Sequence, residues 1–367
     1  MEENNYTEEF SKELEEKEQE EFESDDFAEV PPADIVAFNE LRSCADLVRM
    51  YKTDQLEIKP DFQRDVVWSK AAQTRFIDSL IKQLPIPSMC LSLDYKTGKR
   101  LMIDGLQRIS SIINFLTEKK WKLSALNDID KNISGKTVEQ VKNKNYDVYS
   151  RLENLTIPIT VLRCDYSKKT HMHYLFTIFH RLNTGGNKLN NQEIRNCIFH
   201  GPFNDLLKQL AKYDNFINLL QINPDKTYRF AHEELVLRFL AFNDKHEEYT
   251  GRLAKFLNDY MDDHKNESEE NISAQRLLFE RVIDLLYLRI LDSSPLPRLS
   301  KATTEGILIG ISKNINYLEK LDNKALKAKM NQLREDENYS LENLKDGLSA
   351  KEKVISRLSR AIEIFSE

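Results

Sequence analysis

The stretch at residues 99–116, KRLMIDGLQRISSIINFL, constrains the fold most because its character changes within a few residues. Residues 101–103 are a short apolar run typical of a buried strand, and Asp104 and Gly105 interrupt that run. From Leu106 onward the apolar residues recur at three- and four-residue spacing, as on a helix with one buried face. The stretch therefore predicts a strand, a tight turn and a helix.

The predicted turn is also a candidate anion site. Gly105 supplies backbone freedom, and Asp104 is placed to cap the new helix. Gln107 and Arg108 fall in the first helical turn, where several backbone N–H groups lack intrahelical partners. Free amides, the positive helix end and a guanidinium together favour phosphate. The alternative is that Asp104 only caps the helix and Arg108 only pairs with it at the surface.

Composition narrows the class of protein. A chain of 367 residues with 40% hydrophobic and 31% charged residues is ordinary for a globular protein of two domains. Nothing approaches the roughly 18 consecutive apolar residues of a membrane span, and the acidic N-terminus does not resemble a secretory signal. The four cysteines are widely separated without a C-x-x-C pair, which argues against a zinc ribbon or a disulfide framework. We expect a cytoplasmic protein without a membrane partner.

The net charge of −7 hides an uneven distribution. Residues 1–26 contain 13 acidic residues and only two lysines, which gives 2 − 13 = −11, so the remainder carries +4. We therefore predict a disordered acidic tail over residues 1–30 ahead of a mildly basic body. The tail can serve as a solubility device, or it can mimic nucleic acid and occupy the basic body.

The chain before the central stretch contains a second candidate binding segment. The segment KPDFQRDVVW at residues 59–68 places Gln63 and Arg64 between two large apolar anchors, where their polar ends can point into a cleft or into solvent. Around it we predict an amphipathic helix at 39–51, a strand at 56–58, a helix beginning at Ser69, and a hairpin that pairs 89–93 with 101–103.

A third candidate segment follows a predicted helix at 174–181. That helix leads into NTGG at residues 183–186, and Asn190 is placed to cap the next helix. The two glycines let the backbone approach a ligand, although a glycine helix stop is the plainer reading.

Pro158 marks residues 157–162 as an edge strand, and from residue 203 the pattern is almost entirely helical. The segment SGKT at 134–137 lacks the first glycine and the feeding strand of a phosphate loop, so we reject that reading.

Three blocks in this order resemble the N-terminal domain family of GmrSD-type modification-dependent restriction endonucleases, within the ParB/sulfiredoxin-like superfamily. They are PDFQRDVVW, IDGLQRISSIINFL and FHRLNTGGNKLNNQEIRN. The family usually reads DGQQR, whereas Leu106 stands at the third position here. The resemblance implies an α+β fold: a ParB/sulfiredoxin-like nucleotide-binding domain with a small mixed sheet at 35–200, followed by a mostly helical domain at 201–367.

The resemblance also implies a site that binds or hydrolyses a nucleoside triphosphate of unspecified base, with Mg²⁺ as the expected cofactor. Asp104, Gln107 and Arg108 are then the catalytic candidates, and Asp104 is the candidate metal ligand. The remaining candidates for nucleotide binding are Gln63, Arg64, Gly105, Arg181, Asn183, Thr184, Gly185 and Gly186.

Three functions remain open from the sequence. The first is an NTP-hydrolysing component of bacterial phage defence or DNA restriction, acting on DNA that can carry modified bases. The second is a ParB-like DNA-binding adaptor or clamp that uses nucleotide as a switch. The third, a nuclease that uses Asp104 and Glu193 with a metal, has the least support because such cleavage generally needs several clustered ligands. The C-terminal half shows no His-centred nuclease motif, so we expect a separate nuclease subunit as partner, and self-association is left open.

Overall fold

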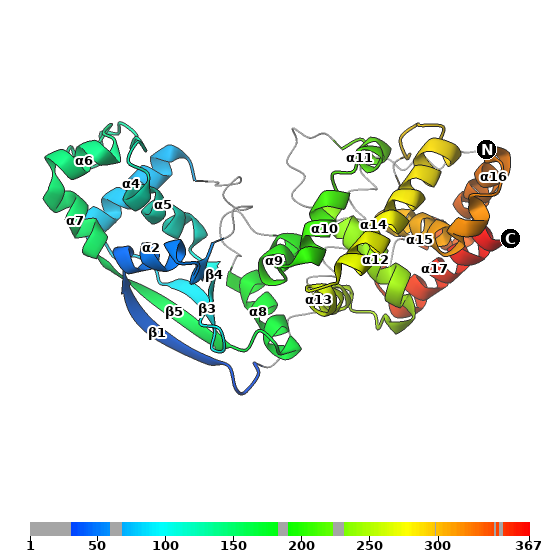
Figure 1. Cartoon of the computed structure of the whole chain (residues 1–367), viewed down its shortest axis with the longest axis horizontal. Coiled ribbons are helices and arrows are strands. Elements are labelled where there is room, and N and C mark those ends of the chain that lie inside the picture. The colour runs from blue at the N-terminus through cyan, green and yellow to red at the C-terminus, as the bar shows by residue number, and fades with distance from the viewer. Residues whose placement is uncertain are drawn as a thin grey trace. The chain divides into compact units, whose positions relative to one another are not determined.

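The structure is a computed structural model that describes residues 31–58, 68–182, 190–222, 231–297, 299–340, 343–344 and 348–367. The chain divides into two compact units between Leu189 and Asn190. The first unit contains the sheet and its covering helices, and the second unit is helical (Figure 1). The acidic segment at 1–30, including the predicted tail, lies outside the described residues.

The first unit is built on a mixed sheet whose described strands follow the order β1-β5-β3-β4-β2. β5 pairs with β1 in antiparallel orientation on one side and with β3 in parallel orientation on the other. β4 is antiparallel to β3 and parallel to β2. The strands are β1 (Val36–Ser43), β2 (Leu56–Glu57), β3 (Met89–Asp94), β4 (Arg100–Asp104) and β5 (Thr156–Cys164). Because β3 and β4 form the predicted hairpin, the prediction for this part of the sheet is confirmed.

Two predictions about the sheet are wrong. Residues 39–43 belong to β1, so the helix predicted at 39–51 begins only at Cys44, after Ser43 caps it. β5 is flanked on both sides rather than lying at an edge. Pro158 is tolerated inside β5 because its pairing with β3 starts one residue later, at Ile159, so no hydrogen bond of that ladder is lost.

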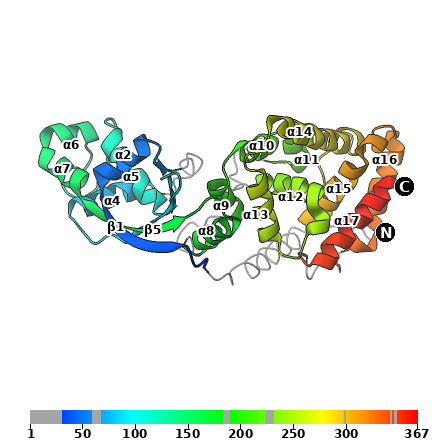
Figure 2. The same ribbon diagram turned by 60° about the horizontal axis from the view of Figure 1, so that its bottom comes forward.

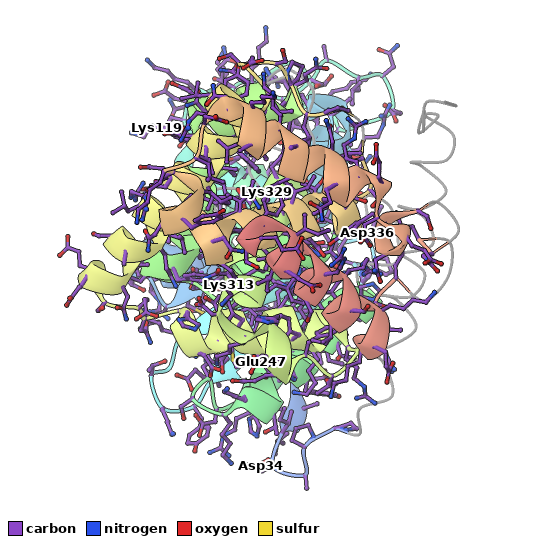
Figure 3. All side chains as sticks on the ribbon, turned by 90° about the vertical axis from the view of Figure 1, so that its right-hand side faces the viewer. Asp34, Lys119, Glu247, Lys313, Lys329 and Asp336 are labelled. Carbon is purple, nitrogen blue, oxygen red and sulfur yellow. The ribbon has the colours of Figure 1, made fainter. Side chains whose placement is uncertain are left out.

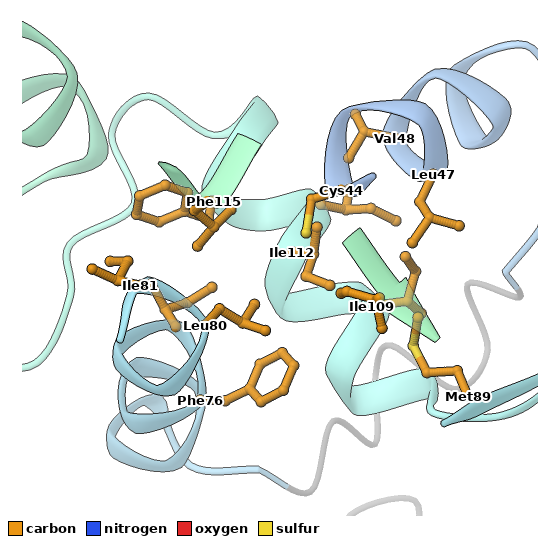
Figure 4. Packing of buried hydrophobic residues seen from close by; sticks show 14 of the residues in the cluster. Cys44, Leu47, Val48, Phe76, Leu80, Ile81, Met89, Ile109, Ile112 and Phe115 are labelled. Carbon is orange, nitrogen blue, oxygen red and sulfur yellow. The ribbon is translucent and has the colours of Figure 1, made fainter. Parts of the chain in front are cut away.

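Helices of the first unit pack on the sheet around one apolar core. They are α2 (Cys44–Lys52), α4 (Lys70–Ile81), α5 (Leu106–Thr117), α6 (Val138–Lys144), α7 (Tyr146–Asn154) and α8 (Lys169–Leu182). Figure 4 shows Ile109, Ile112 and Phe115 of α5 facing the apolar side chains of α2 and α4. All three are fully buried, so α5 is the central helix of this core, as its spacing predicted.

The ends of these helices follow the sequence closely. Ser69 caps α4 by accepting a hydrogen bond from the N–H of Ala72, as predicted. Thr137 begins α6 with a reciprocal capping box to Gln140, which gives the rejected SGKT segment an ordinary structural role.

On β4, Leu101 and Ile103 are buried although they lie outside the main apolar cluster, and α8 packs against this strand. Both faces of β4 are therefore covered.

In its described residues the second unit consists of helices from Asn191 onward, whereas the sequence placed the start of the helical domain at residue 201. They are α9 (Asn191–Ile198), α10 (Pro202–Leu210), α11 (Asp214–Leu220), α12 (Ala231–Lys245), α13 (Leu253–His264), α14 (Glu269–Asp284), α15 (Lys301–Leu318), α16 (Asn323–Glu335) and α17 (Lys351–Ser366). α15 and α17 run side by side (Figure 2). Gly310 permits this approach, because a Cβ there would lie 2.8 Å from the carbonyl oxygen of Ala361.

The predicted fold class is confirmed: the chain is α+β, with a small mixed sheet followed by a helical part. None of the helices among the described residues has both the length and the hydropathy needed to cross a bilayer.

Candidate functional site

The turn between β4 and α5 requires a glycine for two reasons. Gly105 has φ +102°, in the left-handed region that other residues rarely adopt. In addition, a Cβ at this position would lie 2.6 Å from Cγ of Met89, a buried side chain at the start of β3. The glycine of the DGLQR motif is therefore explained by the backbone geometry and by packing, before any ligand is considered.

The prediction that Asp104 caps α5 is wrong. Gly105 occupies the N-cap position, and no side chain accepts a hydrogen bond there. Asp104 is the last residue of β4, and its Oδ2 instead accepts a hydrogen bond of 2.6 Å from Nη2 of Arg108. The first turn of α5 also contains no acidic residue. The helix start therefore keeps its partial positive charge without a carboxylate cap.

Arg108 is held in place by three protein acceptors. Its Nη1 donates to the carbonyl oxygens of Pro87 at 2.5 Å and Ser88 at 3.4 Å, in addition to the bond from Nη2 to Asp104. The Arg108 side chain is only 13% exposed, whereas that of Asp104 is 37% exposed. The expected pairing of these two residues is present, but Arg108 is mostly buried rather than a surface residue. Its Nε–H makes no hydrogen bond to any residue that the structure describes, so it remains a donor for a ligand.

Two polar side-chain atoms on α5 are buried without a partner among the described residues. They are Oε1 of Gln107 and Oγ of Ser110, which lie one turn apart on the helix. The neighbouring Ser111 shows the usual alternative, because its hydroxyl donates to the carbonyl oxygen of Gln107 at 2.8 Å. An unsatisfied buried polar group costs about 1–3 kcal/mol, so such atoms point to a missing partner. Gln107 was predicted as a site residue, whereas Ser110 was missed because nothing in the helical pattern distinguishes it from Ser111.

Sheet topology brings the end of β2, the strand that precedes the first family block in the sequence, to the same edge as the motif. β2 and β4 are parallel neighbours, so their carboxyl ends meet at one edge of the sheet. The segment with Gln63 and Arg64 follows β2 directly, and the motif follows β4 directly. Gln63 and Arg64 themselves lie outside the described residues. Because β3 is antiparallel to β4, its first residues also lie at this edge, where they meet Arg108.

The third family block is split between the two units. Arg181 lies in the last turn of α8 and has interaction partners, while Asn183, Thr184, Gly185 and Gly186 lie outside the described residues. Asn190 caps α9 as predicted, in a capping box in which Oε2 of Glu193 accepts from the N–H of Asn190 at 2.6 Å. Glu193 is only 1% exposed, so its carboxylate already serves the helix start.

The remainder of this block forms a buried polar network in the helical unit. Arg195 is fully buried, and it donates to Oδ1 of Asn258 at 2.9 Å and to Oε2 of Glu234 at 3.1 Å. Arg238 lies 3.1 Å from Oε1 of Glu305 in the same unit. Buried charges are tolerated when they are paired in this way, and removing one partner is costly. We therefore assign the NNQEIRN residues a structural role in joining α9 to α12 and α13.

A second ionic cluster lies at the opposite edge of the sheet, at the carboxyl end of β5. Asp165 is 2% exposed; it accepts hydrogen bonds from Ser167 and forms an ion pair with Lys96 at 2.9 Å. Asp34 binds Lys168 and also Nε2 of His171, at 2.9 Å for the latter. Hydrogen bonds from Lys168 and His171 lower the pKa of Asp34 to about 2. Each of these charges has a partner, so the cluster has the character of a structural clasp.

The described residues contain no group of three or more His, Cys, Asp or Glu side chains that could hold a metal ion. Within the DGLQR motif, residues 104–108, Asp104 is the single carboxylate that could bind a cation. That is compatible with Mg²⁺, which is commonly bound through one or two carboxylates together with substrate phosphates.

One known protein family matches a segment that covers most of the first unit. Residues 44–200 match the GmrSD restriction endonuclease, N-terminal domain. This segment is a GmrSD-type N-terminal domain. The match spans the motif turn, both flanking family blocks and most of the sheet, so the resemblance inferred from the three blocks is confirmed. No curated protein and no solved structure matches the chain.

The match of residues 44–200 to the GmrSD N-terminal domain supports a role in a restriction system. It also suggests DNA as a substrate. The family match does not extend to the helices beyond residue 200.

Proposed function

We propose that the GmrSD-type domain binds and hydrolyses a nucleoside triphosphate at the edge of the sheet where β2 and β4 end. In this proposal the chain is the nucleotide-handling component of a restriction or phage-defence system. The supporting observation is the motif turn itself. It combines an uncapped helix start, a positioned arginine and the unpartnered Oε1 of Gln107 within one helical turn of the described chain.

Each element of this turn suits a phosphate ligand. The free N–H groups at the start of α5 and the helix dipole favour an anion. Arg108 is oriented by Asp104 and the carbonyl groups of Pro87 and Ser88, so little side-chain entropy is lost when its remaining donor binds. The segments with Gln63 and Arg64 and with Arg181 to Gly186 complete the proposed nucleotide contacts. Ligands of open α/β sheets commonly bind beyond the carboxyl ends of strands.

The proposed chemistry depends on positioning and charge. Phosphoryl transfer is catalysed largely by orienting the groups and stabilising negative charge. Arg108 would stabilise charge on the phosphates, and Gln107 would orient the attacking water through its amide. Asp104 would hold Mg²⁺ through the carboxylate oxygen that Arg108 does not use, and bound Mg²⁺ would supply charge neutralisation at the phosphates.

A ParB-like adaptor or clamp that binds nucleotide without useful turnover is the second candidate. The same geometry favours it, because the pairing of Asp104 with Arg108 provides a contact that a ligand could rearrange. The third candidate, a nuclease with Glu193 as a metal ligand, loses support because that carboxylate is buried in a capping box. Nucleotide turnover distinguishes the first two candidates.

The test measures phosphate release and thermal melting with a panel of nucleoside triphosphates and Mg²⁺, with and without DNA. We expect one triphosphate to raise the melting temperature of the full chain, because a ligand that binds only the folded state stabilises it. Arg108→Ala should lose that rise, since one charged hydrogen bond is worth about 1.5–3 kcal/mol, or roughly ten- to a hundredfold in affinity.

Arg108→Ala also removes the link to Pro87 and Ser88, so its melting temperature without ligand should fall. Ile112→Ala is the matched control, because it lowers stability by about 2–5 kcal/mol through a cavity while leaving the motif intact. We expect Ile112→Ala to keep the nucleotide-induced rise. An unchanged rise in Arg108→Ala would overturn the site, whereas binding without phosphate release would favour the adaptor.

A further inference from the structure

The first unit has a concentration of lysines that the proposed nucleotide site does not use. Residues 118–144 contain seven lysines and four acidic residues, which gives a net charge of 7 − 4 = +3. We call these seven residues the lysine surface: Lys119, Lys120, Lys122, Lys131, Lys136, Lys142 and Lys144. All except Lys136 are exposed, and Lys136 is partly exposed.

Short-range pairing brings most of the lysine surface together. Lys122 forms an isolated antiparallel bridge with Thr137, and the carbonyl oxygen of Lys136 accepts from the N–H of Leu123 at 3.0 Å. The carbonyl oxygen of Lys119 accepts from the N–H of Glu139, in the first turn of α6, also at 3.0 Å. The chain after α5 is thus tied to the start of α6, so lysines about 20 residues apart in sequence share one local structure.

The ammonium groups of the lysine surface are not neutralised by any carboxylate that the structure describes. None of the seven forms an ion pair within the described chain, and the contact of Lys142 with a tyrosine ring involves no opposite charge. The nearby acidic groups are partly engaged elsewhere: Asp128 pairs with Arg75 at 2.8 Å, and Asp130 accepts from the N–H of Asn132. Glu118 and Glu139 remain exposed.

Helix stabilisation explains only part of this pattern. Lys142 and Lys144 lie in the last turn of α6, and Lys119 and Lys120 follow the end of α5, where cations interact favourably with the helix dipole. Lys122 and Lys131 lie at no helix end of the described chain, and Lys136 precedes the N-cap of α6, where a cation interacts unfavourably with the helix dipole. An exposed aromatic ring follows α6: Tyr146 is 57% exposed and stacks on Tyr149, and Nζ of Lys142 lies 4.5 Å from the Tyr149 ring centroid.

We infer that the lysine surface binds the phosphate backbone of DNA. Unpaired lysines suit regularly spaced phosphates because each contact releases condensed counterions, and tyrosine hydroxyls also contact phosphate oxygens. The binding is independent of base sequence and positions the duplex on the domain. The choice of DNA rests on the proposed restriction role, whereas the location of the surface rests on the lysines alone.

The test compares two triple variants of the full chain that remove the same charge. Lys120→Gln, Lys122→Gln and Lys144→Gln alter the lysine surface. Lys313→Gln, Lys320→Gln and Lys324→Gln alter exposed lysines of the helical unit, which also lack ion pairs with described residues. Figure 3 labels Lys119 of the lysine surface and Lys313 of the control set. The readout is anisotropy of a fluorescein-labelled DNA duplex over a range of salt concentrations, after thermal melting has confirmed folding.

We expect the first variant to weaken duplex binding at least tenfold at low salt. Its slope of log affinity against log salt should be smaller by up to about 2.7, because each lost phosphate contact contributes about 0.9. The control should change affinity less than twofold. Equal losses of DNA affinity in the two triple variants would overturn the proposal. It would also be overturned if the protein bound an acidic peptide with the sequence of residues 1–26 but did not bind the DNA duplex.

Nucleotide-induced melting of the same variants separates this proposal from the proposed nucleotide site. Loss of DNA binding with the nucleotide response retained supports the lysine surface. An absent nucleotide response in the parent chain would overturn the nucleotide site and leave the DNA result standing.

Discussion

At the residue scale, the fold itself accounts for most of the residues of the motif turn. Gly105 is required by its positive φ and by the proximity of Met89. Arg108 joins the end of β4 to the start of β3, and Asp104 orients it. Gln107 differs from these three residues because its buried Oε1 has no partner in the described chain. Gln107 is therefore the residue of the motif that the fold explains least.

Gly105→Ala should lower the free energy of unfolding by about 2–5 kcal/mol, the sum of left-handed backbone strain and overpacking. Gly98→Ala is the matched control, because Gly98 has φ +73° but no described atom within 4 Å of the point where a Cβ would lie. It should therefore lose only the strain of about 1–2 kcal/mol. Urea unfolding measures both. Equal losses of unfolding free energy in the two variants would contradict the predicted clash with Met89. A double-mutant cycle of Gly105→Ala with Met89→Ala would then show no coupling energy.

At the element scale, the sequence was most informative where local chemistry determines structure. The apolar spacing of α5, the serine cap of α4 and the asparagine cap of α9 all appear as predicted. β1 was missed because most of its residues are exposed and do not alternate in polarity, so its strand conformation depends on pairing with the distant β5. The edge position assigned to β5 was wrong for the same reason, since β1 is the neighbour that covers that side of it.

The candidate site was only partly predictable. The motif residues could be located because they occupy a strand-to-helix junction, but the partners of Arg108 come from Pro87 and Ser88, about 20 residues earlier in the chain. Such contacts depend on sheet pairing and carry no local signal. The unpartnered hydroxyl of Ser110 is likewise a property of the packed helix in the described chain. The predictions for Gln63, Arg64 and the NTGG segment stay predictions.

The clasp between Asp34, just before β1, and the start of α8 should make stability depend on acid pH. The pKa of Asp34 is lowered from 3.8 to about 2 by hydrogen bonds from Lys168 and His171, so the folded state favours the ionised carboxylate. Its contribution is present above about pH 4 and is lost as the pH falls toward 2.

Urea unfolding over this pH range measures the effect. Asp34→Asn should be less stable than the parent at neutral pH, and the difference should shrink as the pH falls. Asp54→Asn is the control, because Asp54 is exposed and has no ion pair with a described residue. A difference between parent and Asp34→Asn that stays constant with pH would show that the carboxylate charge is not what stabilises the clasp.

At the scale of the whole molecule, charge is distributed unevenly along the chain. Residues 1–26 carry −11, whereas the remainder carries +4 and includes the lysine surface. An acidic segment of this kind can compete with DNA for the same cations, because both present closely spaced negative charge. The family match at residues 44–200 does not include this segment, so its contribution has to be measured separately.

Deleting residues 1–26 should strengthen binding of a DNA duplex at low salt, since the net charge changes from −7 to +4. The gain should diminish as salt rises, because screening weakens the competition. A chain whose acidic residues at positions 1–26 are replaced by Gln or Asn controls for length and should behave like the deletion. Equal affinities of the parent and the deletion at low salt would leave the segment as a solubility device. Combining the deletion with Lys120→Gln, Lys122→Gln and Lys144→Gln tests where the acidic segment competes with DNA. If the segment acts on the lysine surface, the combined variant should lose most of the gain in DNA affinity that the deletion gives. A full gain in the combined variant would place the target of the segment elsewhere on the protein.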